Sequence, residues 1–197
     1  MKKNKKIFYG VGIVWLAVWL GGCSKKPIVI DKTPYETKEC SKALAMGLEF
    51  EEEKKIDKLM VYKSKRRLYA YRDGKEIYEF RISLGKNGDK GHKIKQGDLR
   101  TPEGNYTIAR KKCDPRLYRS LMISYPNEKD KAIAKIRGLN PGGYITIHGQ
   151  PKWNANGDGD SYTLARDWTE GCMALSNRAA DVLWSGVANG TAIEIYQ

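Results

Sequence analysis

Alternating apolar residues in the middle of the chain constrain its fold most strongly. Two short runs, at residues 59–61 and 68–71, are rich in β-forming side chains and follow the two-residue period of a strand. Residues 72–75 have the sequence Arg-Asp-Gly-Lys, and an Asp-Gly pair is typical of a tight turn between antiparallel strands. The pattern therefore predicts a β-hairpin whose return strand covers residues 76–84.

More strand signals than helix signals follow along the chain. Strands are expected over residues 106–109, 144–148 and 191–196, and helices over 39–58, 128–137 and 178–184, the last with Asn177 as its N-cap. The Gly- and Lys-rich residues 85–98 and the polar residues 150–160 are expected to be loops, and residues 101–104 (Thr-Pro-Glu-Gly) a turn. Together they predict a β-dominated α+β domain over residues 57–197, with a few short helices and enough length to bury a normal core.

Composition limits the chemistry that this domain can perform. The 197 residues are 41% hydrophobic and 30% charged, which excludes collagen-like, low-complexity and polytopic membrane proteins. Four Cys and two His are too few for a dense disulfide scaffold or a multi-histidine metal site, and we expect neither a metal nor a cofactor. Any catalytic thiol or imidazole must be one of these six residues.

The N-terminal segment has the pattern of an export signal. Four Lys within residues 2–6 precede an uncharged apolar run at 7–20, which is too short for a comfortable transmembrane helix. Residues 20–23 (Leu-Gly-Gly-Cys) resemble a bacterial lipobox, which implies a lipoprotein signal peptide at 1–22 and lipidation of Cys23. Residues 23–56 would then be a lipidated tether with a short helix. The alternative is an uncleaved signal anchor in which Cys23 is incidental.

Export also limits the partners of the protein. Ser24 after the lipobox Cys favours the outer membrane over the inner one, so we expect a lipid-anchored periplasmic protein, most simply a monomer. The full chain has a formal charge of +13, and loss of the signal peptide leaves about +9. Such a surface suits anionic envelope polymers or lipid headgroups. We expect no nucleic-acid partner, because an exported protein rarely meets one and the sequence has no zinc-finger or dinucleotide-binding pattern.

Two short motifs have the residue types of a cysteine nucleophile and its base. His148-Gly149 ends a predicted strand, and Gly171-Cys172 follows 24 residues later. A thiol attacks as its thiolate and therefore needs a base or a positive charge nearby, which a His on a neighbouring strand can supply. A Gly before the Cys allows close approach of backbone and substrate and exposes amides for an oxyanion. The alternative is a buried structural Cys and a surface His.

The wider pattern of the chain resembles the L,D-transpeptidase catalytic domain, the YkuD-type domain. The matching segments occur in the order of that family and cover most of residues 57–197. They are residues 59–63 (Leu-Met-Val-Tyr-Lys) with the following hairpin, 97–106 (Gly-Asp-Leu-Arg-Thr-Pro-Glu-Gly-Asn-Tyr), 147–149 (Ile-His-Gly) and 169–172 (Thr-Glu-Gly-Cys). The resemblance implies a β-sandwich or barrel with a few short helices.

The resemblance also implies an activity on peptidoglycan stem peptides. Cys172 would attack the carbonyl of the diamino acid and form a thioester, with His148 as the base that later protonates the leaving amine. A backbone carbonyl, that of Gly149, would orient the imidazole, and amides of Gly171 and Cys172 would form the oxyanion hole. An amine acceptor would give transpeptidation, and water would give hydrolysis.

One departure from the family narrows the resemblance. Many members have Arg two residues after the nucleophile, where this chain has Ala174. Three other segments, at residues 123–127, 141–143 and 167–177, resemble a Gram-negative YafK-type branch. That branch includes hydrolases that release an outer-membrane lipoprotein from peptidoglycan, so an amidase is the alternative in the same class. A non-catalytic wall-binding lipoprotein is the alternative of another class.

The remaining polar and sulfur-containing residues allow several interpretations. Arg166, Trp168 and Thr169 precede the nucleophile and are candidate substrate-binding residues, Arg166 for a carboxylate and Trp168 for a pocket wall or the core. His92 is expected to be a solvated loop residue. Asp158 and Asp160 are similar to part of a calcium loop, but the closing acidic ligand is missing, which favours a flexible lid.

Two further cysteines remain beside the lipobox cysteine and the nucleophile. In an oxidising compartment a Cys40–Cys113 disulfide could attach the leading helix to the domain, and two buried free thiols are the alternative. Either arrangement leaves Cys172 unpaired.

Overall fold

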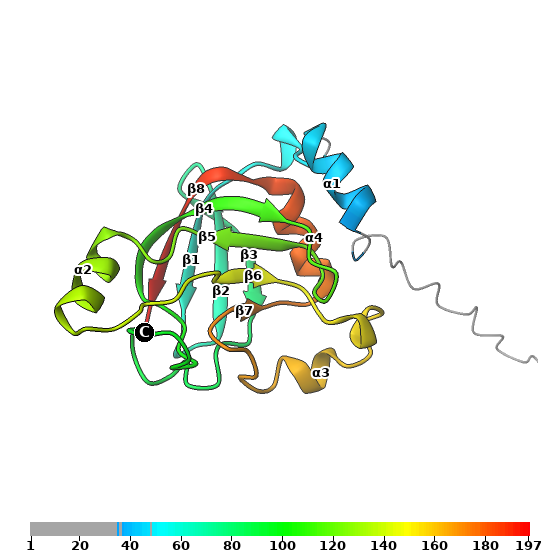
Figure 1. Cartoon of the computed structure of the whole chain (residues 1–197). Helices are drawn as coiled ribbons and strands as arrows, with labels where there is room; N and C mark the ends of the chain where they lie inside the picture. The colour runs from blue at the N-terminus through cyan, green and yellow to red at the C-terminus, as the bar shows by residue number, and fades with distance from the viewer. Residues whose placement is uncertain (1–34, 36, 48) are drawn as a thin grey trace, which may run out of the picture.

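A single eight-stranded sheet forms the centre of the protein (Figure 1). The computed structural model describes Tyr35, residues 37–47 and residues 49–197. Its strands lie in the order β3-β2-β1-β8-β4-β5-β6-β7. They are β1 (Ile56–Tyr62), β2 (Arg67–Arg72), β3 (Lys75–Arg81), β4 (Gly104–Lys112), β5 (Ser120–Ile123), β6 (Thr146–His148), β7 (Met173–Ala174) and β8 (Val187–Tyr196).

Short helices surround this sheet (Figure 1). They are α1 (Thr37–Ala45), η2 (Glu52–Lys54), α2 (Glu128–Ile136), η3 (Lys152–Asn154), α3 (Asp160–Thr163) and α4 (Asn177–Gly186). None of the helices in the described part of the chain combines the length and apolar character that a membrane span requires. The predicted signal peptide at 1–22, the lipidation site Cys23 and most of the tether lie outside the described residues.

The predicted hairpin forms one end of the sheet. Strands β1 and β2 pair antiparallel, with Leu59 opposite Ala70, and β3 continues the meander. The C-terminal strand β8 lies between β1 and β4, parallel to β1 and antiparallel to β4. This insertion places the inward side chains of β1 beside Ile193 and Ile195 in the main core, where burial of apolar area supplies most of the stabilisation.

The two ends of the sheet also meet. Ser83, just after β3, exchanges backbone hydrogen bonds of 2.9 and 2.8 Å with Ala174 in β7. The sheet therefore curls into a half-barrel, and the predicted β-dominated α+β class with a few short helices is confirmed. The same bridge explains why position 174 has a small side chain, because Ala174 is completely buried where the two ends of the sheet meet.

The helix predicted over residues 39–58 is much shorter than expected. Helix α1 ends at Ala45, and Gly47 follows with φ +65°, the left-handed conformation that commonly terminates a helix. The chain then enters β1 at Ile56 because this residue is buried against the core and pairs with Val187. Tertiary pairing thus replaces the last part of the predicted helix with a strand.

Three other boundaries differ from the prediction. The N-cap of α4 is Ser176, because the side chain of Asn177 is used elsewhere: it accepts from the Gln150 amide and donates to Ala155 O. Strand β6 begins at Thr146 because Tyr144 has φ +59°, outside the β region. Strand β8 begins four residues earlier than expected, at Val187, and β5 was not predicted.

Candidate active site

Two neighbouring strands bring the candidate base and nucleophile together. His148 is the last residue of β6, and Cys172 directly precedes β7. These strands pair in parallel, with Ile147 opposite Met173. His148 interacts with the Cys172 thiol and lowers its pKa, and Cys172 is the free cysteine among the described residues. The two predicted residues therefore form a thiol–imidazole pair.

The surroundings of Cys172 favour its thiolate. Burial raises the pKa of the thiol. The interaction with His148 lowers this pKa, and so do two hydrogen bonds from Thr146; together they outweigh the effect of burial. The pKa of Cys172 therefore lies below its ordinary value. A lower pKa increases the fraction of reactive thiolate near neutral pH.

Thr146 is a site residue that the sequence analysis missed. Its backbone N–H and its hydroxyl each donate to Sγ of Cys172 at 3.5 Å. The signal was present in the predicted strand, because residues two apart on a strand face the same side and Thr146 precedes His148 by two. The Cys172 thiol in turn lies 3.8 Å from the carbonyl oxygen of Tyr144.

The imidazole of His148 is held from two sides. Its Nδ1 lies 2.7 Å from the carbonyl oxygen of Gly149, and Trp168 packs edge-on against the ring with centroids 5.8 Å apart. Gly149 itself cannot be replaced easily, because a Cβ there would lie 2.6 Å from the Asn177 side chain and 2.7 Å from Tyr118. The base is therefore buried and fixed in orientation.

The turn before the nucleophile depends on Gly171 and Thr169. Gly171 has φ +130°, and a Cβ at this position would lie 2.7 Å from Arg100 O. Its amide donates to Thr169 Oγ1 at 3.1 Å, and that hydroxyl donates to Cys172 O at 2.7 Å. Thr169 was predicted to bind substrate, but it is buried and its hydrogen bonds stabilise the turn.

An open pocket of about 240 Å³ lies over Cys172. One wall comes from the turn at residues 142–145 and the other from Lys93, Gln96 and Gly97 of the loop that the sequence predicted at 85–98. Glu170 completes the lining. The lining combines polar and apolar surface, and Lys93 and Glu170 add one charged residue of each sign.

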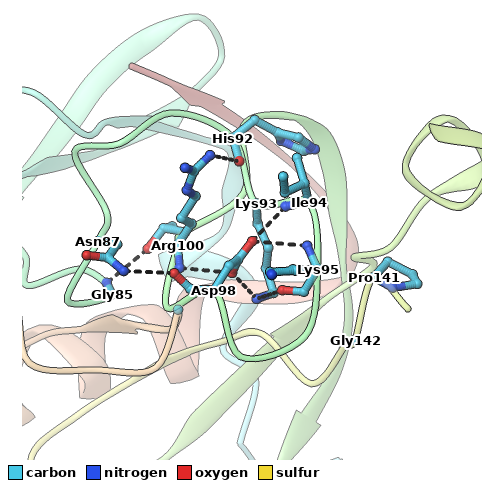
Figure 2. A network of polar contacts seen from close by, with 12 residues as sticks. Gly85, Asn87, His92, Lys93, Ile94, Lys95, Asp98, Arg100, Pro141 and Gly142 are labelled. Atoms are coloured by element: carbon cyan, nitrogen blue, oxygen red, sulfur yellow. Dashed lines mark hydrogen bonds and ion pairs between the residues drawn. The ribbon is translucent and has the colours of Figure 1, made fainter. Parts of the chain in front are cut away.

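Asp98 holds the loop that forms this wall in shape (Figure 2). Its carboxylate accepts from Lys93 Nζ at 2.7 Å and from the amides of Ile94, Lys95 and Arg100 at 2.8, 3.0 and 3.1 Å. Burial raises the pKa of Asp98, but these donors outweigh it and the pKa lies below its ordinary value. A Gly- and Lys-rich sequence thus forms an ordered loop around one buried ion pair.

The other two candidate substrate-binding residues line hollows other than this pocket. Trp168 lines a second, apolar hollow with Pro151, Trp153 and Tyr162. The guanidinium of Arg166 stacks on the ring of Tyr162 at 3.6 Å. Neither residue lines the pocket over Cys172, so the structure gives no direct support to their role as substrate-binding residues.

His92 is not a solvated loop residue, and that expectation was wrong. Its Nδ1 accepts from the Glu103 amide at 2.9 Å, and its Nε2 lies 3.2 Å from the carboxylate of the buried Asp130. Tyr106 donates to the same carboxylate at 3.1 Å. The imidazole therefore joins the turn at residues 101–104 to helix α2, a long-range contact that a single sequence does not reveal.

The acidic loop near Asp158 and Asp160 is held by hydrogen bonds of its own. Asn154 is buried and donates to Asp160 at 2.9 Å, and Asp158 accepts from Asn156. Across the described residues, no group of three or more His, Cys, Asp or Glu is arranged to hold a metal ion. The polar segment 150–160 is also not purely a surface loop, because Gln150 and Asn154 are buried.

Cys40 and Cys113 form a disulfide in the structure, across 73 residues of sequence. The bond attaches helix α1 to the residue that directly follows β4. Tyr35, just before α1, is also buried and donates to Gln150 O at 2.9 Å. The N-terminal part of the described chain is therefore fastened to the domain near the loop after His148.

The part of the chain that forms this sheet and pocket matches a known family. The family model "L,D-transpeptidase catalytic domain" (YkuD) matches residues 57–195, and the chain belongs to this family. The match covers almost the whole predicted domain of residues 57–197.

Two relatives show how far the similarity extends. The chain is 30% identical to YafK of Escherichia coli strain K12 over 134 residues, which is 66% of this chain and 46% of YafK. The structure of the helical cell shape determining protein Pgp2 from Campylobacter jejuni matches with a TM-score of 0.54 and 30% identity, covering 71% of this chain and 47% of Pgp2. The structure of the K307A mutant of Pgp2 matches with a TM-score of 0.52 and 25% identity, covering 85% of this chain and 56% of the mutant chain. The chain thus spans about half the length of these relatives.

Proposed function

We propose that the protein is an exported cysteine acyltransferase that acts on peptidoglycan stem peptides. The single observation that supports this most strongly is the Cys172–His148 pair, with a depressed thiol pKa, at the floor of an open pocket in a domain of the L,D-transpeptidase family. A wall-binding protein without catalysis would need neither an activated thiol nor a fixed imidazole.

The reaction proceeds in two steps. The thiolate of Cys172 attacks the carbonyl carbon of the diamino acid in the stem peptide, after its proton has passed to His148. The C–N bond then breaks, His148 protonates the leaving amine, and a thioester remains on Cys172. In the second step an amine or water attacks the thioester, its proton goes to His148, and the C–S bond breaks.

The oxyanion of each step needs donors that are free to receive it. The Gly171 amide already donates to Thr169, so we assign the Cys172 amide as the first donor. Gly149 supplies the carbonyl that orients His148. Lys93, Gln96 and Glu170 form the rim that receives the stem peptide.

We further propose that the protein is held in the periplasm by a lipid on Cys23, at the outer membrane. The lipobox-like residues 20–23 support this, since their pattern is that of a lipoprotein signal. Mass spectrometry of the membrane-extracted full chain tests it. A lipid-modified N-terminal Cys23 is expected, and an unmodified chain that retains residues 1–22 would contradict it.

One experiment tests the activity and separates its two outcomes. The full chain in detergent is incubated with tetrapeptide muropeptides and, separately, with muropeptides that carry a covalently linked lipoprotein fragment. Cross-linked dimers indicate transfer, and a stem peptide that ends in a free carboxylate at the diamino acid indicates hydrolysis, whereas release of the lipoprotein fragment with a free amine shows only that the acyl-enzyme has formed. Cys172→Ala is the control and is expected to lose all turnover while its thermal unfolding stays close to that of the wild type. Turnover by that variant would refute the cysteine mechanism.

A further inference from the structure

Tyr35 contacts the loop that follows the candidate base, although it lies outside the matched family domain. It precedes helix α1, whereas the family model begins at residue 57, yet its side chain is only 2% exposed. Its ring packs edge-on against Tyr118 with centroids 5.5 Å apart, in a small cluster with Ala180 that is separate from the main core. A buried tyrosine hydroxyl needs hydrogen-bond partners, and here both partners lead toward His148.

The hydroxyl of Tyr35 acts as donor and acceptor at the same time. It donates to the carbonyl oxygen of Gln150 at 2.9 Å, and it accepts from Nδ2 of Asn177 at 3.4 Å. The carbonyl oxygen of Gln150 also accepts from the amide of Tyr118 at 3.0 Å. One hydroxyl therefore joins the loop after β6 to the first residue of α4.

Asn177 extends this constraint to the peptide between Gly149 and Gln150. Its Oδ1 accepts from the Gln150 amide at 2.7 Å, while its Nδ2 donates to Ala155 O at 2.9 Å as well as to Tyr35. The side-chain amide is thus held at both ends. The direction in which the Gln150 N–H points is fixed as a result.

The same peptide carries the group that orients the base. A peptide unit is planar and rigid, so the direction of its N–H fixes the direction of its C=O. In the peptide between Gly149 and Gln150, the N–H points to Asn177 and the carbonyl oxygen lies 2.7 Å from Nδ1 of His148. A rotation of this plane that weakens one contact therefore weakens the other.

We propose that Tyr35 is a positioning residue for His148. Its hydroxyl holds Asn177 and Gln150, these two hold the peptide plane, and the plane keeps the imidazole turned toward the thiol. The inference rests on the proposed function, in which His148 is the base. It adds to the site a residue from the segment that precedes the family domain.

A purely structural anchor is the alternative role for Tyr35. An anchor needs only the contacts of the ring, which packs beside Tyr118 and lies under the ammonium group of Lys152 at 5.9 Å. A positioning residue needs the hydroxyl. The two roles can be separated, because Phe keeps the ring contacts and lacks both hydrogen bonds.

Tyr35→Phe tests the proposal in the full chain in detergent. With tetrapeptide muropeptides, kcat is expected to fall about five- to tenfold, the kinetic equivalent of one hydrogen bond. KM should be unchanged, because Tyr35 does not line the pocket over the thiol. The matched control is Tyr106→Phe, which removes a buried hydroxyl that contacts Glu103 O and Asp130, and which should leave both constants unchanged.

The Nδ1 proton of His148 gives a readout that a structural anchor would not change. This proton is hydrogen-bonded to Gly149 O, so heteronuclear NMR of histidine-labelled protein should show it far downfield and in slow exchange with water. His148→Ala identifies the signal among the two histidines of the chain. In Tyr35→Phe the proton is expected to exchange about fivefold faster, and in Tyr106→Phe it should behave as in the wild type.

Asn177→Ala tests the route by which Tyr35 acts. This variant removes the acceptor of the Gln150 N–H and is expected to lower kcat by a similar factor. The double variant Tyr35→Phe/Asn177→Ala should be no slower than the slower single variant, because both changes act on one peptide plane. If the two effects multiply instead, Tyr35 does not act through this peptide and the proposal is overturned.

Other results refute the inference or the function beneath it. A kcat and a proton exchange rate equal to those of the wild type in Tyr35→Phe would leave Tyr35 as an anchor only. A lower kcat with unchanged exchange would also refute the positioning role, because the effect would then bypass His148. Absence of muropeptide turnover in the wild type would refute the proposed function instead, and the exchange rates would still decide on Tyr35.

Discussion

Nδ1 of His148 lies 2.7 Å from the carbonyl oxygen of Gly149, the next residue along the chain. A carbonyl oxygen only accepts, so the proton of the neutral imidazole is at Nδ1 and Nε2 is free to accept the proton of Cys172. The backbone thus does the orienting that a carboxylate does in a Ser-His-Asp triad. Because this partner is uncharged, it fixes the ring without adding a full negative charge to the site.

The first prediction concerns this base. His148→Ala is expected to lower the rate of stem-peptide turnover by at least about 10², the usual scale for loss of a general base. It should also slow alkylation of Cys172 by iodoacetamide near neutral pH, since the interaction with His148 lowers the thiol pKa. Both rates are measured on protein whose circular dichroism matches the wild type. Full activity would reject His148 as the base.

The second prediction concerns Thr146 as a positioning residue. Thr146→Val removes the hydroxyl that donates to Cys172 Sγ at 3.5 Å but keeps the backbone donor and the side-chain size. The thiol pKa is expected to rise, so the pH profile of alkylation should move to higher pH and the rate at pH 7 should fall about threefold. Thr107→Val, at an exposed threonine of β4, is the control. An unshifted profile in Thr146→Val would contradict this role.

The third prediction concerns the ion pair that shapes the pocket wall. Asp98→Asn leaves the nearly buried Lys93 without its carboxylate and is expected to lower the free energy of unfolding by about 3–5 kcal/mol. The folded-state pKa of Asp98 is depressed, so this stabilisation is present above the unfolded value of about 3.9 and is lost as the pH falls through the folded value.

The difference in unfolding free energy between the wild type and Asp98→Asn should therefore be largest near neutral pH and decrease below about pH 4. Urea unfolding at several pH values measures it. Asp89→Asn, an exposed aspartate in the same loop, should stay within about 0.5 kcal/mol of the wild type. A difference that does not depend on pH would show that the carboxylate charge is not what stabilises the loop.

The fourth prediction concerns Lys63, whose charged group is completely buried. Its Nζ donates to Gly91 O at 2.9 Å, to Thr101 O at 3.1 Å and to Glu103 at 2.7 Å. Lys63→Met leaves these acceptors without a donor and is expected to cost about 3–5 kcal/mol of unfolding free energy in urea denaturation. Lys75→Met, at an exposed lysine on β3, is the control, and an equal effect in both would contradict the assignment.

The fifth prediction concerns the disulfide between Cys40 and Cys113. The double variant Cys40→Ser/Cys113→Ser loses a cross-link that closes a long loop, so its unfolding free energy is expected to fall by about 2–4 kcal/mol. The acylation rate of Cys172 should be unchanged at temperatures where the variant is folded. Addition of a reductant to the wild type should reproduce the loss of stability, and unfolding midpoints that remain equal would contradict it.

The sequence alone was sufficient to predict most of the local elements and to select the candidate nucleophile and base. The Asp-Gly turn and the alternating residues around it predicted the hairpin, because turn chemistry and the two-residue period are local properties. The same holds for helix α2, found at Glu128–Ile136 where residues 128–137 were predicted. With only two His and four Cys in the chain, the motifs around His148 and Cys172 were also sufficient to select both residues.

Only the tertiary structure decided which distant residues meet. The parallel pairing of β6 with β7 places Cys172 beside His148 and adds Thr146, and the insertion of β8 converts the end of a predicted helix into β1. The tertiary structure also places His92 against Asp130. It brings together residues between 151 and 168 to form the apolar hollow, and Trp168 of this hollow packs against His148. These contacts depend on long-range pairing and on competition for burial, and a pattern of neighbouring residues contains neither.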